Sequence, residues 1–184
     1  MRSLRHLGLV ALAFALTAGA AHGEGVSLEV RGAYFSPSDK TFRDIYGYGI
    51  SWGGEIGFRV SRRAAAWVGG DYFSKTGKLG LTEEDTKIRI APLAAGAKYY
   101  LALAKLRPYL GAGVAYVQYK ESNSIATIEK GALGLIGRVG LLAVLGTGIF
   151  ADIQGTWSTC SVQPAEVRAN LGGFSFGAGL GFEF

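Results

Sequence analysis

Apolar side chains at every second position are the feature that most constrains this sequence. The alternation is clearest in residues 173–184, where one set of alternate positions is apolar: Phe174, Phe176, Ala178, Leu180, Phe182 and Phe184. The positions between them are small or polar: Gly173, Ser175, Gly177, Gly179, Gly181 and Glu183. Because successive side chains of a β-strand point to opposite faces, the pattern predicts a strand with one apolar face.

The same period recurs along the chain and predicts eight strands of about ten residues each. Positions expected to share the apolar face are Val26, Leu28, Val30, Tyr34, Ile50, Trp52, Ile56, Phe58, Val60, Val68, Tyr72, Leu93, Ala95, Ala97, Tyr99, Leu110, Ala112, Val114, Tyr116, Leu133, Leu135, Val139, Leu141, Ile149, Ala151, Ile153 and Trp157. The connections alternate between short (61–63, 102–107, 142–146) and longer, more polar segments (36–46, 76–85, 120–130, 158–170). Strands of this length can cross a bilayer at a tilt. The fold class predicted is all-β, an eight-stranded antiparallel up-and-down transmembrane β-barrel.

One strand leaves its register open. Residues 93–99 place Leu93 and Tyr99 outward, and the same period carried backward places Lys87 and Arg89 outward as well. Either these cations lie beyond the bilayer, or a bulge near Pro92 resets the alternation, since proline lacks an N–H and is tolerated at bulges.

The N-terminus predicts export. Arg2 and Arg5 precede an apolar run over 7–16 and small residues over 18–23, which indicates a cleavable signal peptide at 1–23. Residues 24–184 are then expected to form a single barrel domain.

Several classes of function are disfavoured by composition. The only histidines, His6 and His22, fall in the predicted signal peptide, so a Ser–His pair is excluded from the remainder and no enzyme is expected. Neither a cofactor nor a metal site is predicted. The mild positive charge is spread along the chain, which disfavours a nucleic-acid partner. Cys160 is the only cysteine, so no intramolecular disulfide can form.

The inward positions carry charges of both signs. An eight-stranded barrel is only wide enough inside for side chains, and charges buried there must pair. We therefore predict an ionic network in the barrel interior: Glu29, Arg31, Glu55, Arg59, Asp71, Lys98, Arg138 and Asp152. Such a network favours a largely filled polar interior and a structural or surface-interaction role. Because many inward positions are glycine, a narrow pore or conduit for small apolar molecules stays open as an alternative.

Basic residues also gather at the predicted outer rim, where lipopolysaccharide would present phosphates. The residues predicted to contact it are Lys40, Arg43, Lys75, Lys78, Lys120 and Arg168. An equally good explanation is that these residues are ordinary charged side chains of loops exposed to water.

From residue 24 to 184 the chain resembles the outer-membrane β-barrel domain family, the small OmpA- and OmpX-like eight-stranded barrels. The resemblance is carried by Leu180, Phe182 and Phe184 in the last strand and by the segment 42–47, FRDIYG. It implies a monomer in the outer membrane of a Gram-negative bacterium, in contact with outer-membrane lipid. It also implies that the last strand, through Leu180, Phe182 and Phe184, is the signal read by the barrel-assembly machinery.

Overall fold

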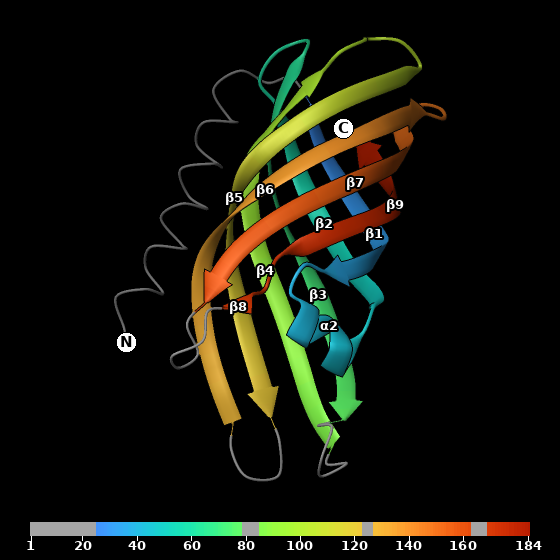
Figure 1. Ribbon diagram of the computed structural model, residues 1–184. Helices are drawn as coiled ribbons and strands as arrows, with labels where there is room; N and C mark the ends of the chain where they lie inside the picture. Colours follow the sequence, from blue (N-terminus) through green and yellow to red (C-terminus); the bar gives the residue numbers. More distant parts are fainter. Residues whose placement is uncertain (1–24, 79–84, 123–126, 163–168) are drawn as a thin grey trace.

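The computed structural model describes residues 25–78, 85–122, 127–162 and 169–184 (Figure 1). The predicted signal peptide lies outside these residues. In chain order the elements are β1 (Val26–Pro37), α2 (Lys40–Tyr46), β2 (Gly49–Arg59), β3 (Ala64–Lys78), β4 (Asp85–Tyr100), β5 (Leu106–Ser122), β6 (Thr127–Val144), β7 (Ile149–Val162), β8 (Ala169–Asn170) and β9 (Gly173–Glu183).

Eight long strands close into a ring of antiparallel pairs. Strands β1 to β7 pair in sequence order, and β9 joins β7 to β1, from Ser27 opposite Glu183 to Pro37 opposite Gly173. The two-residue β8 pairs only with the end of β7 among the described strands. The predicted eight-stranded antiparallel barrel is thus confirmed.

Alternation along the strands sorts side chains between the outside and the lumen. Large apolar residues assigned to the outer face are exposed, as at Leu133 (76%) and Val30 (71%). Their inward neighbours are buried, as Arg31 and Ile136 illustrate. The outer surface is therefore an apolar band. Contact of this band with lipid is favourable, whereas its contact with water is not.

Strand β4 passes Pro92 without a bulge. Its pairing with β5 keeps one register from Lys87 opposite Ser122 to Tyr100 opposite Tyr109. Lys87 and Arg89 consequently face outward and are exposed. Since β3 to β6 contain 15 to 18 residues, the prediction of about ten residues per strand was wrong for them. These four strands extend past the others at the end with the longer connections, here called the long-loop end (Figure 1).

The helix α2 was not anticipated from the sequence. Asp39 caps its N-terminus by accepting a hydrogen bond from the Phe42 amide at 3.0 Å, and Gly47 ends it with φ of 64°. Phe42 and Tyr46, one turn apart, are buried against the barrel. Aspartate before a helix and glycine after it are both capping signals. The helix was missed because its seven residues are too few to show a helical period. Among the described residues, no helix is long and apolar enough to span a membrane.

Candidate functional site: the barrel lumen

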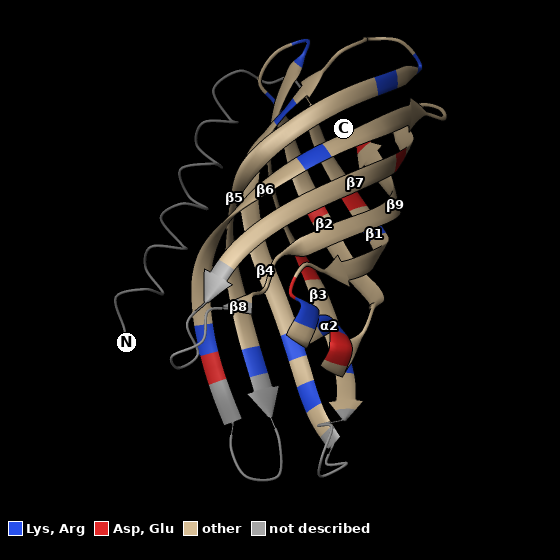
Figure 2. Cartoon of the chain, viewed as in Figure 1, with Lys and Arg blue, Asp and Glu red and all other residues tan. Residues whose placement is uncertain are grey.

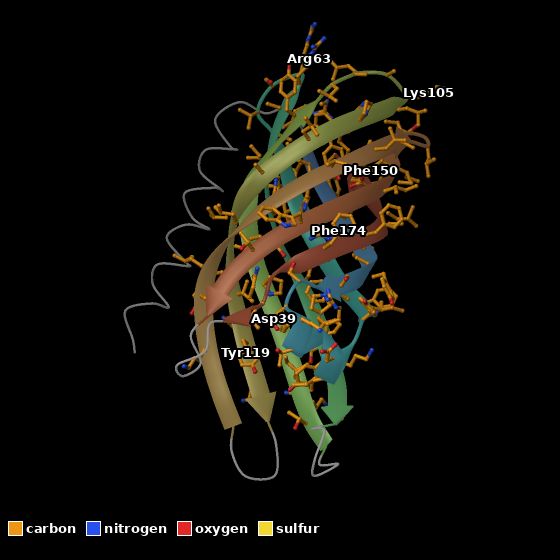
Figure 3. The ribbon with its side chains drawn as sticks, in the orientation of Figure 1. Asp39, Arg63, Lys105, Tyr119, Phe150 and Phe174 are labelled. Carbon is orange, nitrogen blue, oxygen red and sulfur yellow. The ribbon has the colours of Figure 1, made fainter. Side chains whose placement is uncertain are left out.

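The lumen contains three layers of side chains. A proximal layer lies toward the short turns and consists of Ala65, Tyr100, Tyr109, Leu142 and Phe150. An ionic layer follows, and a distal layer toward the long-loop end includes Phe35, Phe73, Ile88, Ile90, Val117, Tyr119 and Ile136, with Phe42 and Tyr46 of α2. Figure 3 shows Phe150 and Tyr119 toward opposite ends. Apolar layers therefore lie on both sides of the ionic layer, so the predicted polar interior does not extend through the whole lumen.

Glu55 is the centre of the ionic layer. Its carboxylate accepts hydrogen bonds from Lys98 and Arg138, and from Arg31 at 3.3 Å. Lys98 also lies 3.9 Å from Glu29. Each of these five residues is 4–6% exposed, so the charges are screened by one another rather than by water.

Arg31 extends the ionic layer toward the long-loop end. Its guanidinium donates to both carboxylate oxygens of Asp71, at 3.0 and 3.1 Å, and lies 3.9 Å from Glu29. Planar bidentate pairing of this kind fixes the orientation of the guanidinium relative to the carboxylate as well as the distance between them. Arg31 therefore links three of the predicted acids: Glu29, Glu55 and Asp71.

Neutral groups complete the ionic layer. Tyr109 donates its hydroxyl proton to Asp152 at 2.7 Å, and Gln154 donates to Glu29 at 3.3 Å. The Trp67 ring lies 4.0 Å from the Arg138 guanidinium. Tyr109, Gln154 and Trp67 are absent from the predicted network, although their positions alternate with outward residues and so place them inside.

Arg59 is separated from the ionic layer. It pairs with Glu183 near the short turns, and the same carboxylate lies 3.4 Å from Arg107. The prediction of one network containing Arg59 was wrong. The alternation of side chains shows whether a residue faces the lumen, but it does not show how far along the barrel axis that residue lies. Arg59 is four residues from Glu55, about 13 Å along an extended strand.

Inward glycines near the short turns make room for aromatic rings. A Cβ atom at Gly140 would collide with the Tyr109 ring, and one at Gly181 would collide with the Phe150 ring. Both rings are at most 4% exposed. In the proximal layer these two glycines therefore make room for the packed rings of Tyr109 and Phe150.

A cavity of about 80 Å³ lies between the ionic and distal layers. One water needs roughly 10–15 Å³ on this measure, so the space is large enough for a small molecule. Its lining is mostly apolar and includes Phe35, Phe73, Ile90, Val117, Ile136 and Cys160, with Arg31 and Asp71 at the ionic side. No group of three or more potential metal ligands occurs in the described residues.

The predicted rim cations have different surroundings. Arg43 donates to the Pro37 carbonyl at 3.2 Å, and Lys75 donates to the Tyr48 carbonyl. Lys40 is exposed on α2, and Lys120 lies 3.7 Å from Glu129. Arg168 and the Lys78 side chain lie outside what the structure describes. The basic bands of β4 and β5 are seen at the long-loop end in Figure 2.

We predict that Glu55→Gln lowers the free energy of unfolding by about 3 kcal/mol or more, because it leaves buried cations without their shared anion. Glu129→Gln is the matched control: it breaks an ion pair whose side chains are 70% and 44% exposed and should cost less than about 1 kcal/mol. Urea unfolding of both variants in the same lipid measures the difference. Equal losses would contradict the central role of Glu55.

Comparisons with known proteins find similarity in structure only. No family model and no curated protein matches the sequence. The OprF N-terminal β-barrel domain of Pseudomonas aeruginosa is similar at 18% identity with a TM-score of 0.57, covering 88% of this chain and 98% of that chain.

Two further solved structures give higher TM-scores. Neisserial surface protein A has 17% identity and a TM-score of 0.66, covering 89% of this chain and 98% of its own. The outer membrane protein OprG of Pseudomonas aeruginosa has 15% identity and a TM-score of 0.69, covering 88% and 96%. The chain therefore has the fold of the small eight-stranded outer-membrane β-barrels.

Proposed function

We propose that this protein is an integral barrel of the Gram-negative outer membrane whose lumen is closed, with a structural or surface-interaction role. The observation that carries the proposal is the layered lumen: buried aromatic residues lie on both sides of a paired ionic layer. The apolar outer band and the shared fold support the location. Export by the predicted signal peptide is part of the same proposal.

A non-catalytic role is also proposed. Residues 24–184 contain no histidine, and the buried side chains of Arg31, Glu55, Lys98 and Arg138 are engaged with one another. A general base needs a free lone pair within reach of a substrate. The geometry of Glu55, surrounded by three cations, does not offer one.

Refolded protein in planar bilayers should give no steady open-channel current, since the proximal and ionic layers block ions. Tyr109→Ala combined with Arg138→Ala removes one large side chain from each of these layers and should produce measurable current. The double variant thus shows that the assay detects an opened lumen. Steady current from the unmodified protein would overturn the closed-lumen proposal.

A second candidate function, intake of small apolar molecules, is supported by the apolar cavity below the distal layer. The ionic layer closes one side of that cavity, so the candidate requires entry and exit through the distal half. The apolar part of its lining, which is larger than the polar part, would favour a small hydrocarbon over water.

Cys160 lines this cavity and provides a probe of it, because it is the only cysteine. A small apolar ligand such as benzene or hexanol should slow modification of Cys160 by a neutral thiol reagent. A Gln118→Cys variant in a Cys160→Ser background carries its thiol on the exposed outer surface and should show no protection. Equal rates with and without ligand at Cys160 would exclude this candidate.

We further propose that the long-loop end contacts lipopolysaccharide through Lys87, Arg89 and Lys120. Arg89 and Lys120 are directly opposite on neighbouring strands, and both face outward. Like charges in such positions repel, and of these three cations only Lys120 forms an ion pair in the described part of the chain, with Glu129. A lipid phosphate between these cations would relieve the repulsion. Lys40 is retained as a solvent-exposed candidate, whereas Arg43 and Lys75 already donate to carbonyls.

The charge-reversed variant Lys87→Glu/Arg89→Glu/Lys120→Glu should retain less lipopolysaccharide after purification than the unmodified protein. Its matched control reverses three cations at the opposite end, Arg62→Glu/Arg63→Glu/Lys105→Glu, and should leave retention unchanged. Quantifying lipid A phosphate in equal amounts of each protein makes the comparison. Unchanged retention in the first variant would contradict the assignment.

A further inference from the structure

The short-turn end of the barrel carries a second group of exposed cations. Arg62 and Arg63 lie in the turn between β2 and β3, and Lys105 lies in the turn between β4 and β5. The two turns are neighbours, because the Tyr100 amide donates to the Arg63 carbonyl at 2.8 Å. Figure 3 shows Arg63 and Lys105 at this same end of the barrel. We call these three residues the basic rim.

Acidic residues do not neutralise the basic rim. Within the described residues the acid at this end is Glu183, and Arg59 and Arg107 already share it. None of the three rim cations forms an ion pair in the described part of the chain.

Apolar side chains are interleaved with the rim cations. Val60 (67% exposed) precedes Arg62, Leu103 precedes Lys105, and Leu145 (62% exposed) lies in the third short turn. Leu103 and Leu145 belong to connections, so the outer apolar band does not account for them, whereas Val60 directly follows β2 in its outward register. Exposed apolar groups beside long cationic side chains are typical of the membrane interface, where the apolar part enters the acyl region and the charge reaches the headgroups.

We propose that the basic rim binds the phosphodiester headgroups of anionic glycerophospholipids in the adjoining membrane leaflet. The inference rests on the proposed insertion of the barrel in a membrane. Arg62 and Arg63 present guanidinium groups that can each hold two phosphate oxygens, and Lys105 adds a point charge on the neighbouring turn. Leu103 and Val60 anchor the turns beside the headgroups. The cations and the apolar groups thus select a charged lipid surface over a soluble anion.

The test uses the refolded protein in nanodiscs of phosphatidylcholine containing increasing amounts of phosphatidylglycerol. Amide resonances of residues 60–63 and 101–105 should shift with the phosphatidylglycerol fraction and reach saturation. Arg62→Gln/Arg63→Gln/Lys105→Gln should weaken this dependence about tenfold or more, since each cation near a lipid surface contributes about fivefold. The matched control, Lys87→Gln/Arg89→Gln/Lys120→Gln, should leave the shifts at the short turns unchanged.

Three outcomes would overturn the inference: equal shifts with either lipid, unchanged dependence in the triple rim variant, or the same shifts from soluble glycerophosphate without lipid. The last result would identify a site for free anions instead of a membrane contact. Failure of the barrel to insert in either lipid would instead contradict the proposed function. Insertion without a response at the short turns would contradict only the assignment of the basic rim.

Discussion

Pairing of every strand on both edges is the constraint on which the rest of this structure depends. A strand that faces hydrocarbon cannot leave amides and carbonyls unpaired, because no water is present to accept or donate hydrogen bonds. The β1–β9 pairing closes the ring, and among the described strands residues 74–78 of β3 and 127–133 of β6, at the long-loop end, lack a partner strand on one edge. Once the ring is closed, each strand has one face outside and one inside, so the period of two assigns every side chain to one of two environments. The apolar column from Phe174 to Phe182 belongs to the closing strand β9, and Phe184 follows directly after it.

Closure with eight strands also determines how the lumen must be filled. The interior is too narrow for a water-filled channel, so each inward charge must find a partner among the other inward residues. Glu55 meets three cations, and Arg31 meets three acids, which distributes the charge over several strands. Glu29, Arg31, Glu55, Lys98 and Arg138 of this layer are at most 6% exposed, so they depend on one another rather than on water. Replacement of one member is therefore expected to affect the whole layer and not a single pair.

The sequence predicted the face of a residue much better than its position along the barrel. Parity placed Glu29, Arg31, Glu55, Lys98 and Arg138 inside, where they are buried. The alternation could not show that Arg59 would pair with Glu183 rather than with Glu55. The position of a side chain along the barrel axis depends on how neighbouring strands are staggered, which the alternation does not reveal. The helix α2 was missed for another reason: its seven residues are shorter than the window in which a helical period can be recognised.

Strand β4 shows why residue type alone is a poor guide to function in such a chain. Lys98 and Arg89 are nine residues apart with opposite parity, and no bulge at Pro92 resets the alternation. Lys98 is consequently buried against Glu55, whereas Arg89 is exposed on the outer surface of the strand extension. An outward cation within the apolar band would be costly, but beyond the band it can meet headgroup phosphates at little cost. The length of β4 therefore allows one strand to supply both a cation buried in the lumen and exposed cations suited to contact lipid.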